Sequence, residues 1–410
     1  MNPIFQYPCF NYAGLNTPTP YYIVDRALLR RNMRIIKDVQ ERSGCKILLA
    51  MKAFSTWGVF DEIVPYVAGV ATSSVNEALL GQEHFKLNNK TDPKTIHVYS
   101  PAYSMEEMIT LCKIADHIVF NSLAQWKMFR GVVENAGRKI EIGLRINPEY
   151  SEVSQEIYNP CTTRSRFGVR LEGLMDAGSN ALDGIDGFHF HTMCQQGSDV
   201  LQRTLEVVCE RFEKYFDQIK WINFGGGHHI TRMGYDINRL CRIITAFREK
   251  YGLDVILEPG ETHVIHTGFL VSTVLDVIEN PNGIDVVILD TSAAAHMPDI
   301  LEMPYTPEIL GARRNVEDCD APLEEGRFKY IIGSKTCLSG DIIGEYMFPM
   351  PLKIGDRLTL EDMSQYTTCK NTTFNGIQLP SIVSCDSETE DGSFCVHRQF
   401  GYEDFRNRLS

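Results

Sequence analysis

The stretch Lys46-Ile47-Leu48-Leu49-Ala50-Met51-Lys52-Ala53-Phe54 decides how this chain is interpreted. Its apolar run between two lysines predicts a buried strand of a parallel sheet. Lys52 then lies at the carboxyl end of that strand, where α/β folds keep their chemistry. A partly desolvated lysine there loses its proton readily and can form a Schiff base with a carbonyl group. The alternative is an ordinary lysine whose ammonium reaches into solvent.

After this stretch, strand-like and helix-like patterns alternate. Together with the Lys52 strand, eight strands are predicted, the other seven at 69–72, 95–100, 117–121, 140–146, 185–191, 221–224 and 255–258. Helix-like stretches separate them, among them 75–85, 105–115, 123–136, 201–216 and 237–251. Eight βα units over about 250 residues specify a TIM (β/α)8 barrel, which we expect over residues 27–266.

The pattern changes after Glu258. Four β-type runs separated by Gly, Pro and Asn turns predict a β-rich domain over residues 267–410, at 269–277, 286–289, 330–332 and 357–360. The lone strand-like run 21–24 has no place in a barrel that begins with a helix, so we expect residues 1–26 to join the β domain. The stretches 318–325 and 385–392 resemble solvated loops.

Composition limits the function classes. The net charge of −13 argues against nucleic-acid binding and is compatible with a cationic ligand. No apolar run is long enough to cross a membrane, and the N-terminus lacks the pattern of a signal peptide. The twelve cysteines are scattered without a C-x-x-C pair, which predicts reduced thiols in a cytoplasmic protein.

Two motifs fall at the ends of predicted barrel strands, and a third signal lies inside one. Gly225-Gly226-Gly227 follows the seventh strand, where successive amides can bind phosphate; the alternative is a flexible turn. Glu258 ends the eighth strand and can bind a ligand or form a structural ion pair. Arg145 lies inside the fifth strand, where a charge must be paired or functional.

His189-Phe190-His191 at the sixth strand indicates a rival chemistry. Its two imidazoles lie on one face of a strand, as in many metal sites. The further His or carboxylate ligands that a metal needs do not appear at neighbouring predicted strand ends. We therefore expect no metal.

The β domain adds two candidates. Cys337 lies in the Gly-bounded polar loop 333–341, although a lone cysteine is more often a small buried apolar residue. Tyr366 follows the β-type run that ends near residue 361, and its hydroxyl can reach a ligand.

Taken in order, these motifs resemble the alanine-racemase-fold decarboxylases that depend on pyridoxal 5'-phosphate (PLP). That family includes the ornithine, diaminopimelate and arginine decarboxylases. The resemblance covers nearly the whole chain and rests on Lys52, the sixth-strand histidine, G-G-G, E-P-G at 258–260, T-C-x-S-G-D at 336–341 and E-D-M-x-x-Y-T at 361–367.

Within that family the chain is most similar to the carboxynorspermidine and carboxyspermidine decarboxylases. The stretches that carry this similarity are 49–54, 189–192, 257–261 and 289–299. Two departures from the amino-acid decarboxylases agree with it. His191-Thr192-Met193-Cys194 stands where those enzymes usually have His-x-Gly-Ser, and Glu261 replaces the arginine of Glu-Pro-Gly-Arg.

The resemblance implies a cofactor site. Lys52 would bind PLP covalently, and Glu258 would hydrogen-bond the pyridine nitrogen. His191 would lie over one face of the ring, and Arg145 would orient the neighbours of the ring. The residues implied for the phosphate are Gly225, Gly226, Gly227 and Tyr366.

The resemblance also implies decarboxylation of carboxynorspermidine or carboxyspermidine to norspermidine or spermidine. Cys337, supplied by the partner subunit of a homodimer, would return a proton to the substrate carbon. Glu261, Asp290 and Asp299 would bind the distal ammonium groups. The alternatives related by fold are diaminopimelate decarboxylase, or another basic amino-acid decarboxylase, and an amino-acid racemase. A non-catalytic PLP carrier protein is a further alternative, but it would be a bare barrel, and the long β domain argues against it. A metal-dependent barrel hydrolase is the alternative outside this fold.

Overall fold

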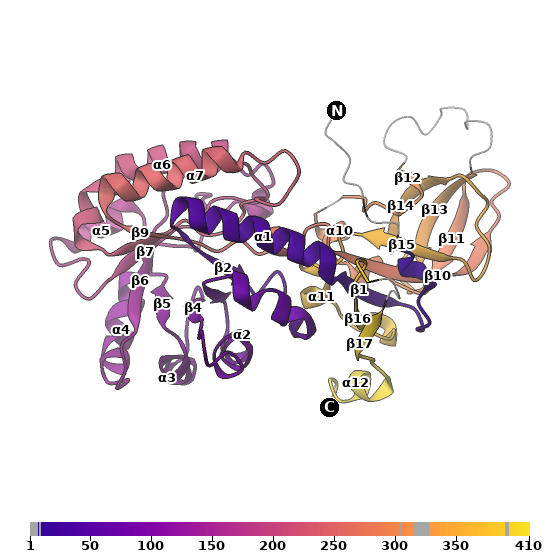
Figure 1. The fold of residues 1–410 in the computed structure, drawn as a ribbon, viewed down its shortest axis with the longest axis horizontal. Coiled ribbons are helices and arrows are strands. Elements are labelled where there is room, and N and C mark those ends of the chain that lie inside the picture. The colour runs from indigo at the N-terminus through magenta and orange to yellow at the C-terminus, as the bar shows by residue number, and fades with distance from the viewer. Residues whose placement is uncertain (1–6, 8–9, 304, 315–327, 390–392) are drawn as a thin grey trace. The chain divides into compact units, whose positions relative to one another are not determined.

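The structure is a computed structural model that describes residues 7, 10–303, 305–314, 328–389 and 393–410 (Figure 1). It divides into two compact units. The barrel unit comprises Arg31–Ala53 and Phe60–His263, and the sheet unit comprises the described residues of Ile4–Arg30, Phe54–Val59 and Val264–Ser410. The loop expected at 318–325 lies outside the described residues.

Eight parallel strands close the barrel in chain order, which confirms the predicted TIM barrel. The pairing of Ile47 with Leu257 joins the last strand to the first. The strands are β2 (Lys46–Ala50), β3 (Gly69–Thr72), β4 (Thr95–Tyr99), β5 (His117–Phe120), β6 (Glu141–Arg145), β7 (Gly187–His189), β8 (Trp221–Asn223) and β9 (Asp254–Leu257).

α-Helices alternate with these strands, except that two short 3-10 helices, Trp57–Glu62 and Val64–Tyr66, connect β2 to β3 (Figure 1). The α-helices are α1 (Arg26–Ser43), α2 (Val75–Gly81), α3 (Met105–Ile114), α4 (Leu123–Glu134), α5 (Leu171–Ala177), α6 (Ser198–Phe212) and α7 (Ile237–Tyr251). Their starts follow from the sequence, because Ser74, Ser104 and Ser122 each accept a hydrogen bond from the amide three residues on. Gly252 ends α7 in the left-handed conformation that suits glycine.

A mixed sheet of nine strands forms the second unit. Its strands are β1 (Tyr21–Asp25), β10 (Gly268–Ile278), β11 (Asp285–Leu289), β12 (Arg313–Arg314), β13 (Phe328–Ser334), β14 (Ile342–Phe348), β15 (Arg357–Glu361), β16 (Ser381–Cys385) and β17 (Phe394–Arg398). The N-terminal strand β1 pairs with β10 and β16, so the prediction that it joins the β domain is confirmed.

The strands β12, β14, β16 and β17 of this sheet were not predicted. The expected solvated loop from residue 385 is wrong at its first residue, because Cys385 ends β16 and is buried. The pairing of β16 with β1 accounts for this burial, since β1 lies far away in the sequence.

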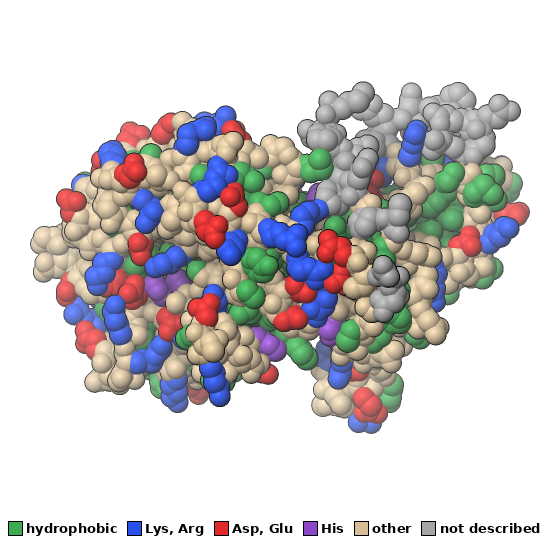
Figure 2. All heavy atoms as spheres, viewed as in Figure 1, with side chains coloured by type: hydrophobic (Ala, Val, Ile, Leu, Met, Phe, Trp, Pro, Cys, Tyr) green, Lys and Arg blue, Asp and Glu red, His purple; other side chains and the backbone are tan. Residues whose placement is uncertain are grey.

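The surface carries charged side chains of both signs. On the face shown in Figure 2, Lys and Arg side chains are intermingled with Asp and Glu side chains. Among the described residues, no helix combines the length and the apolar character needed to cross a membrane.

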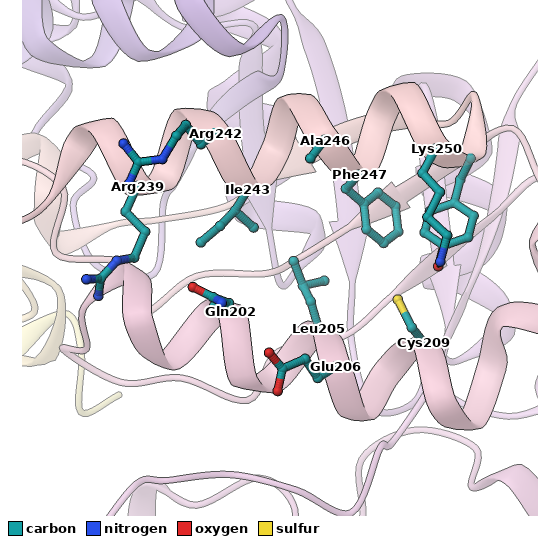
Figure 3. Close-up of a pocket in the computed structure, with 11 residues that line it drawn as sticks. Gln202, Leu205, Glu206, Cys209, Arg239, Arg242, Ile243, Ala246, Phe247 and Lys250 are labelled. Carbon is teal, nitrogen blue, oxygen red and sulfur yellow. The ribbon is translucent and has the colours of Figure 1, made fainter.

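A groove of about 500 Å³ lies between α6 and α7 in the outer layer of the barrel unit (Figure 3). Leu205, Ile243 and Phe247 contribute its apolar wall, and Arg242 and Glu206 lie on its rim. None of the residues predicted for the site lines it.

Candidate active site

The carboxyl ends of the barrel strands bring seven predicted residues to one mouth. Arg145 ends β6, and Lys52 follows β2 by two residues. His191 follows β7, Glu258 follows β9, and the glycine loop 225–227 follows β8. Parallel strands of a closed barrel all end on the same side, so segments far apart in the sequence share this mouth.

Lys52 lies in a turn directly after β2. Water reaches its side chain because the mouth is open, but the barrel wall around it is a poor substitute for bulk water. This desolvation and the like charge of Arg145 lower the pKa of Lys52, although Glu258 opposes the shift. A lowered pKa gives Lys52 more of the neutral amine that attacks carbonyl groups.

Glu258 is held by one side chain on each carboxylate oxygen. Asn223 Nδ2 donates to Oε1 over 2.6 Å, and His189 Nε2 lies 3.1 Å from Oε2. Burial alone would raise the pKa of Glu258, but His189, Asn223 and Lys52 outweigh burial and the pKa is lowered. Glu258 is therefore an anion, ready to accept a further hydrogen bond from a ligand.

Arg145 is buried among aromatic rings and forms no ion pair with a carboxylate of the described residues. Its guanidinium carbon lies 4.6 Å from the centre of the Tyr99 ring and 4.5 Å from that of Phe167. Nη2 also donates to the His191 carbonyl over 3.4 Å. Such cation–π contacts stabilise a buried guanidinium without neutralising it, so Arg145 keeps the mouth electropositive.

His191 is fixed by the glycine loop. The Gly226 amide donates to His191 Nδ1 over 2.8 Å, which leaves the proton of the neutral ring on Nε2. Burial, followed by the charges of Lys52 and Arg145, lowers the pKa of His191 well below its usual value. His191 therefore presents a neutral ring at the mouth.

The glycines of this loop are required by space. A Cβ at Gly225 would lie 2.4 Å from the Phe190 carbonyl oxygen, and one at Gly227 would lie 2.1 Å from that of Met193. The Gly225 amide is already bonded to Asn223 Oδ1. Since Gly226 donates to His191, Gly227 is the glycine of the loop 225–227 whose amide has no hydrogen bond to the described residues.

Glu261 lies beside the segment that carries Lys52. A Cβ on the preceding Gly260 would lie 2.4 Å from Ala53 Cβ, so the two backbones are in close contact. Gln195 Nε2 donates to Glu261 Oε1 over 2.7 Å, and His229 Nε2 lies 3.1 Å from Oε2. The carboxylate is thus oriented by a neutral amide and an imidazole.

Within the sheet unit, Cys337 is exposed on a well-anchored loop. Its amide donates to Asn375 Oδ1 over 2.8 Å. Four residues on, the buried Asp341 accepts hydrogen bonds from Ser292 Oγ at 2.7 Å and from the Ala294 amide at 2.9 Å. Asp341 therefore ties the cysteine loop to the segment 290–299.

The two sheet-unit aspartates have different surroundings. Asp290 is buried and accepts hydrogen bonds from Thr19, Ser272 and the Thr273 amide, as a structural carboxylate does. Asp299 instead forms an ion pair with Lys370, which also pairs with Glu302.

Tyr366, at the start of the short helix α11 (Thr367–Lys370), has a positive φ of 54°. Its half-buried ring lies on the same short segment as Lys370, four residues on.

Sequence reasoning did not find Asn223 or Glu302. Asn223 is predicted only as a residue of the seventh strand, two positions before the glycine loop, and Glu302 lies outside every recognised motif. His189, considered as a metal ligand, instead contacts Glu258. Within the described ranges, no group of three or more His, Cys, Asp or Glu side chains is arranged to hold a metal ion.

The barrel mouth fits a phosphorylated pyridine aldehyde. It contains a lysine with a lowered pKa, a largely desolvated carboxylate that could face a ring nitrogen, and a glycine loop. Thr192 Oγ1 and Gln196 Oε1 nearby are buried without a hydrogen-bond partner among the described residues. Unsatisfied buried polar atoms are rare in proteins and are typical of ligand sites.

Comparisons with known proteins point to the same chemistry. The family described as "Pyridoxal-dependent decarboxylase, C-terminal sheet domain" matches residues 21–364. The chain is 42% identical to the carboxynorspermidine/carboxyspermidine decarboxylase of Campylobacter jejuni subsp. jejuni, over 95% of this chain and 98% of that protein. It is 41% identical to the carboxyaminopropylagmatine decarboxylase of a Synechocystis species, over 96% and 95%.

A solved structure is similar over the same length. The crystal structure of carboxynorspermidine decarboxylase from Campylobacter jejuni, complexed with norspermidine, matches with a TM-score of 0.85 and 40% identity. The match covers 96% of this chain and all of that one.

Proposed function

The chain belongs to the family of pyridoxal-dependent decarboxylases, and we propose that it decarboxylates carboxynorspermidine or carboxyspermidine to norspermidine or spermidine. Its cofactor is pyridoxal 5'-phosphate and its reaction class is that of a carboxy-lyase. The observation that carries the substrate proposal is the 42% identity, over 95% of the chain, to a decarboxylase of that name.

Residues of the barrel mouth would hold the cofactor. Lys52 would bind it covalently through the ε-nitrogen, and Glu258 would accept a hydrogen bond from the pyridine nitrogen. His191 and Arg145 would flank the ring, and the glycine loop 225–227 with Tyr366 would bind the phosphate. When bound, the cofactor supplies the electron sink that decarboxylation requires.

The acidic side chains would select a cationic substrate. Glu261 would bind a distal ammonium at the mouth, and Asp299 a second one. The ion pair of Asp299 and Glu302 with Lys370 supports this role, because Lys370 carries the primary ammonium group that a polyamine also presents. The sequence also suggested Asp290, but its internal hydrogen bonds favour a structural role.

Cys337 would return a proton to the substrate carbon after loss of CO₂. Its exposure and its anchored loop support this role, because the thiol has to approach a ligand. As the resemblance implies, the enzyme would be a homodimer in which Cys337 completes the site of the partner. The described cysteines are all free thiols, as expected in the cytoplasm.

A second substrate, carboxyaminopropylagmatine, is favoured by one observation. The 41% identity to a decarboxylase of that name almost equals the 42% that supports carboxynorspermidine. That substrate ends in a guanidinium instead of an ammonium, which a carboxylate binds in a two-pronged geometry.

Measured kcat/KM values for CO₂ release from four substrates would test the proposal. These are carboxynorspermidine, carboxyspermidine, carboxyaminopropylagmatine and diaminopimelate. We expect one of the first two to be preferred by at least about tenfold, because one charge-assisted hydrogen bond accounts for that much. A preference for carboxyaminopropylagmatine or diaminopimelate would contradict it.

A further inference from the structure

Three hydrogen bonds form a closed ring at the barrel mouth. Asn223 Nδ2 donates to Glu258 Oε1 over 2.6 Å. The Glu258 amide donates to the Gly225 carbonyl over 2.7 Å, and the Gly225 amide donates to Asn223 Oδ1 over 2.9 Å. The ring joins the side chain of Glu258 to its own backbone through two residues of the neighbouring strand end.

The pairing of β8 with β9 makes this ring possible. Asn223 pairs with Ile256, which places Gly225 opposite Glu258 two residues further along. Asn223 is 1% exposed, so water does not compete for either hydrogen bond of its side chain. A buried amide with both ends occupied holds one orientation.

His189 contacts the carboxylate oxygen that the ring leaves open. Its Nε2 lies 3.1 Å from Glu258 Oε2, and its exposed fraction is 2%. A carboxylate only accepts, so the proton lies on Nε2. The Tyr99 ring, which also carries the cation–π contact with Arg145, has its centre 5.3 Å from that of His189.

We propose that Asn223 and His189 are positioning residues that keep Glu258 ionised and aimed at the cofactor nitrogen, and that Asn223 couples this carboxylate to the phosphate-binding loop. The two donors supply what a largely desolvated carboxylate needs in order to stay charged. Through Gly225, the same asparagine fixes the backbone that precedes Gly226 and Gly227. The pyridine end and the phosphate end of the site therefore share one support.

The inference rests on the family's cofactor and not on the substrate proposed above. Its test measures cofactor affinity and the absorption spectrum of the bound cofactor, beside kcat and KM. A wrong substrate assignment would leave cofactor affinity and spectrum unaffected, so the two proposals fail separately.

Asn223→Leu removes both hydrogen bonds with little change in volume. Asn147→Leu is its matched control, because Asn147 is 3% exposed, follows β6 and also makes two hydrogen bonds, with Phe167 and Glu149. We expect Asn223→Leu to raise the Kd of the cofactor by about 10- to 100-fold, the range for loss of one charge-assisted hydrogen bond. Asn147→Leu should change it less than about threefold. Equal effects would assign Asn223 a purely structural role and overturn the proposal.

Asn223→Asp separates the hydrogen bond to Glu258 from the hydrogen bond with the Gly225 amide. It also provides the test if the leucine variant does not fold. The introduced carboxyl group would still accept from Gly225, but it donates to Glu258 only while protonated. Because two carboxylates this close share one proton, kcat should be lost as the pH rises, in a limb that the wild type lacks. An unchanged pH profile would contradict the role of Asn223.

Two variants test the second donor. His189→Gln can still donate an N–H to Glu258, whereas His189→Leu cannot. We expect the leucine variant to shift the absorption of the bound cofactor and to lower kcat by about 10- to 100-fold, and the glutamine variant to recover most of both. Identical behaviour of the two variants would show that His189 acts only by filling space.

Discussion

The barrel mouth and the loops of the sheet unit hold their candidate residues in different ways. At the mouth, Glu258, His191 and the glycine loop are bonded to one another, through Asn223 and through the amide of Gly226. In the sheet unit, Cys337, Asp290 and Asp299 each have a separate set of partners. Cys337 is fixed through Asn375 and Asp299 through Lys370.

This difference follows from the folds. Parallel strands of a barrel end at one mouth, so a few residues after the strands become neighbours without any special loop. The sheet unit has to place single residues on loops, and buried anchors such as Asp341 fix each loop. We therefore expect substitutions at the mouth to affect the cofactor, and substitutions in the sheet loops to affect single steps or stability.

The largest effect should come from Lys52→Ala. Without the ε-amine the cofactor has no covalent link, so its visible absorption should disappear and kcat should fall by roughly 10⁴-fold or more, as for other covalent catalysts. Lys46→Ala is the matched control, because Lys46 begins the same strand and pairs at the surface with Asp254. Borohydride labelling followed by mass spectrometry should mark position 52. Labelling elsewhere would remove the barrel mouth as the cofactor site.

Cys337→Ala should have the next largest effect. If Cys337 contributes only the return of the proton, kcat of the variant should fall by about 10²- to 10⁴-fold, the usual contribution of a general acid. The absorption of the bound cofactor should stay unchanged. Cys395→Ala controls for loss of another exposed thiol of the same unit. Release of cofactor from the Cys337 variant would contradict the view that the barrel mouth alone holds the cofactor.

The two regions also differed in how far the sequence predicted them. The sequence predicts all eight barrel strands from apolar runs that mostly alternate with helical patterns. Lys52 and Glu258 follow from the ends of such runs, and Arg145 follows from a charge inside one. The ring through Asn223 was not found, since it depends on the pairing of Asn223 with Ile256 and not on any local signal.

The sheet unit was harder to predict because its strands are supported from far away in the sequence. The strand β17 is largely exposed and lacks a buried face that alternation would reveal. It forms by pairing with β16, which in turn pairs with β1. The structural role of Asp290 is hard to predict for the same reason, because its partners Thr19 and Ser272 come from two other segments.

Glu261→Gln should produce a moderate effect on one parameter. The change removes the charge but keeps the size, so KM for the proposed polyamine substrate should rise by about 10- to 100-fold with kcat little changed. Initial rates over a range of substrate concentrations measure this. An unchanged KM would show that Glu261 serves only His229 and Gln195.

Asp290→Asn, in the sheet unit, should affect stability instead of KM. Three hydrogen bonds hold the Asp290 carboxylate, and an amide cannot accept at both ends. We expect a loss of about 1–3 kcal/mol in the free energy of unfolding, measured by denaturant titration, and no change in KM. A raised KM with unchanged stability would instead make Asp290 a substrate ligand.

The smallest expected effects concern the pH dependence of stability, which should differ between the two units. In the described barrel unit, burial lowers the pKa of six histidines, including the stacked pair His97 and His117, whose ring centres are 3.9 Å apart. Unfolding would return each pKa to about 6.5. Below that pH the unfolded state binds more protons, so the barrel unit loses stability as the pH falls. The titratable groups that act on the stacked pair are Lys46, Lys86, Asp116, Glu141, Asp186 and His189.

The sheet unit contains the opposite case. Burial raises the pKa of Glu361 to about 7, so the folded state binds the extra proton between its ordinary value of 4.5 and about 7. Its stability contribution is then lost as the pH rises through that window, although His296, with a pKa lowered to about 3, opposes this in the same unit. Each proton of difference changes the free energy of unfolding by about 1.4 kcal/mol per pH unit.

Hydrogen exchange of the holoenzyme at pH 5 and pH 7, followed by mass spectrometry, measures the pH dependence of each unit separately. We expect β4 and β5 to exchange faster at pH 5 than at pH 7, after correction for the intrinsic rates, and Glu361→Gln to make β15 less sensitive to pH. An equal response of both units would remove this last distinction between them.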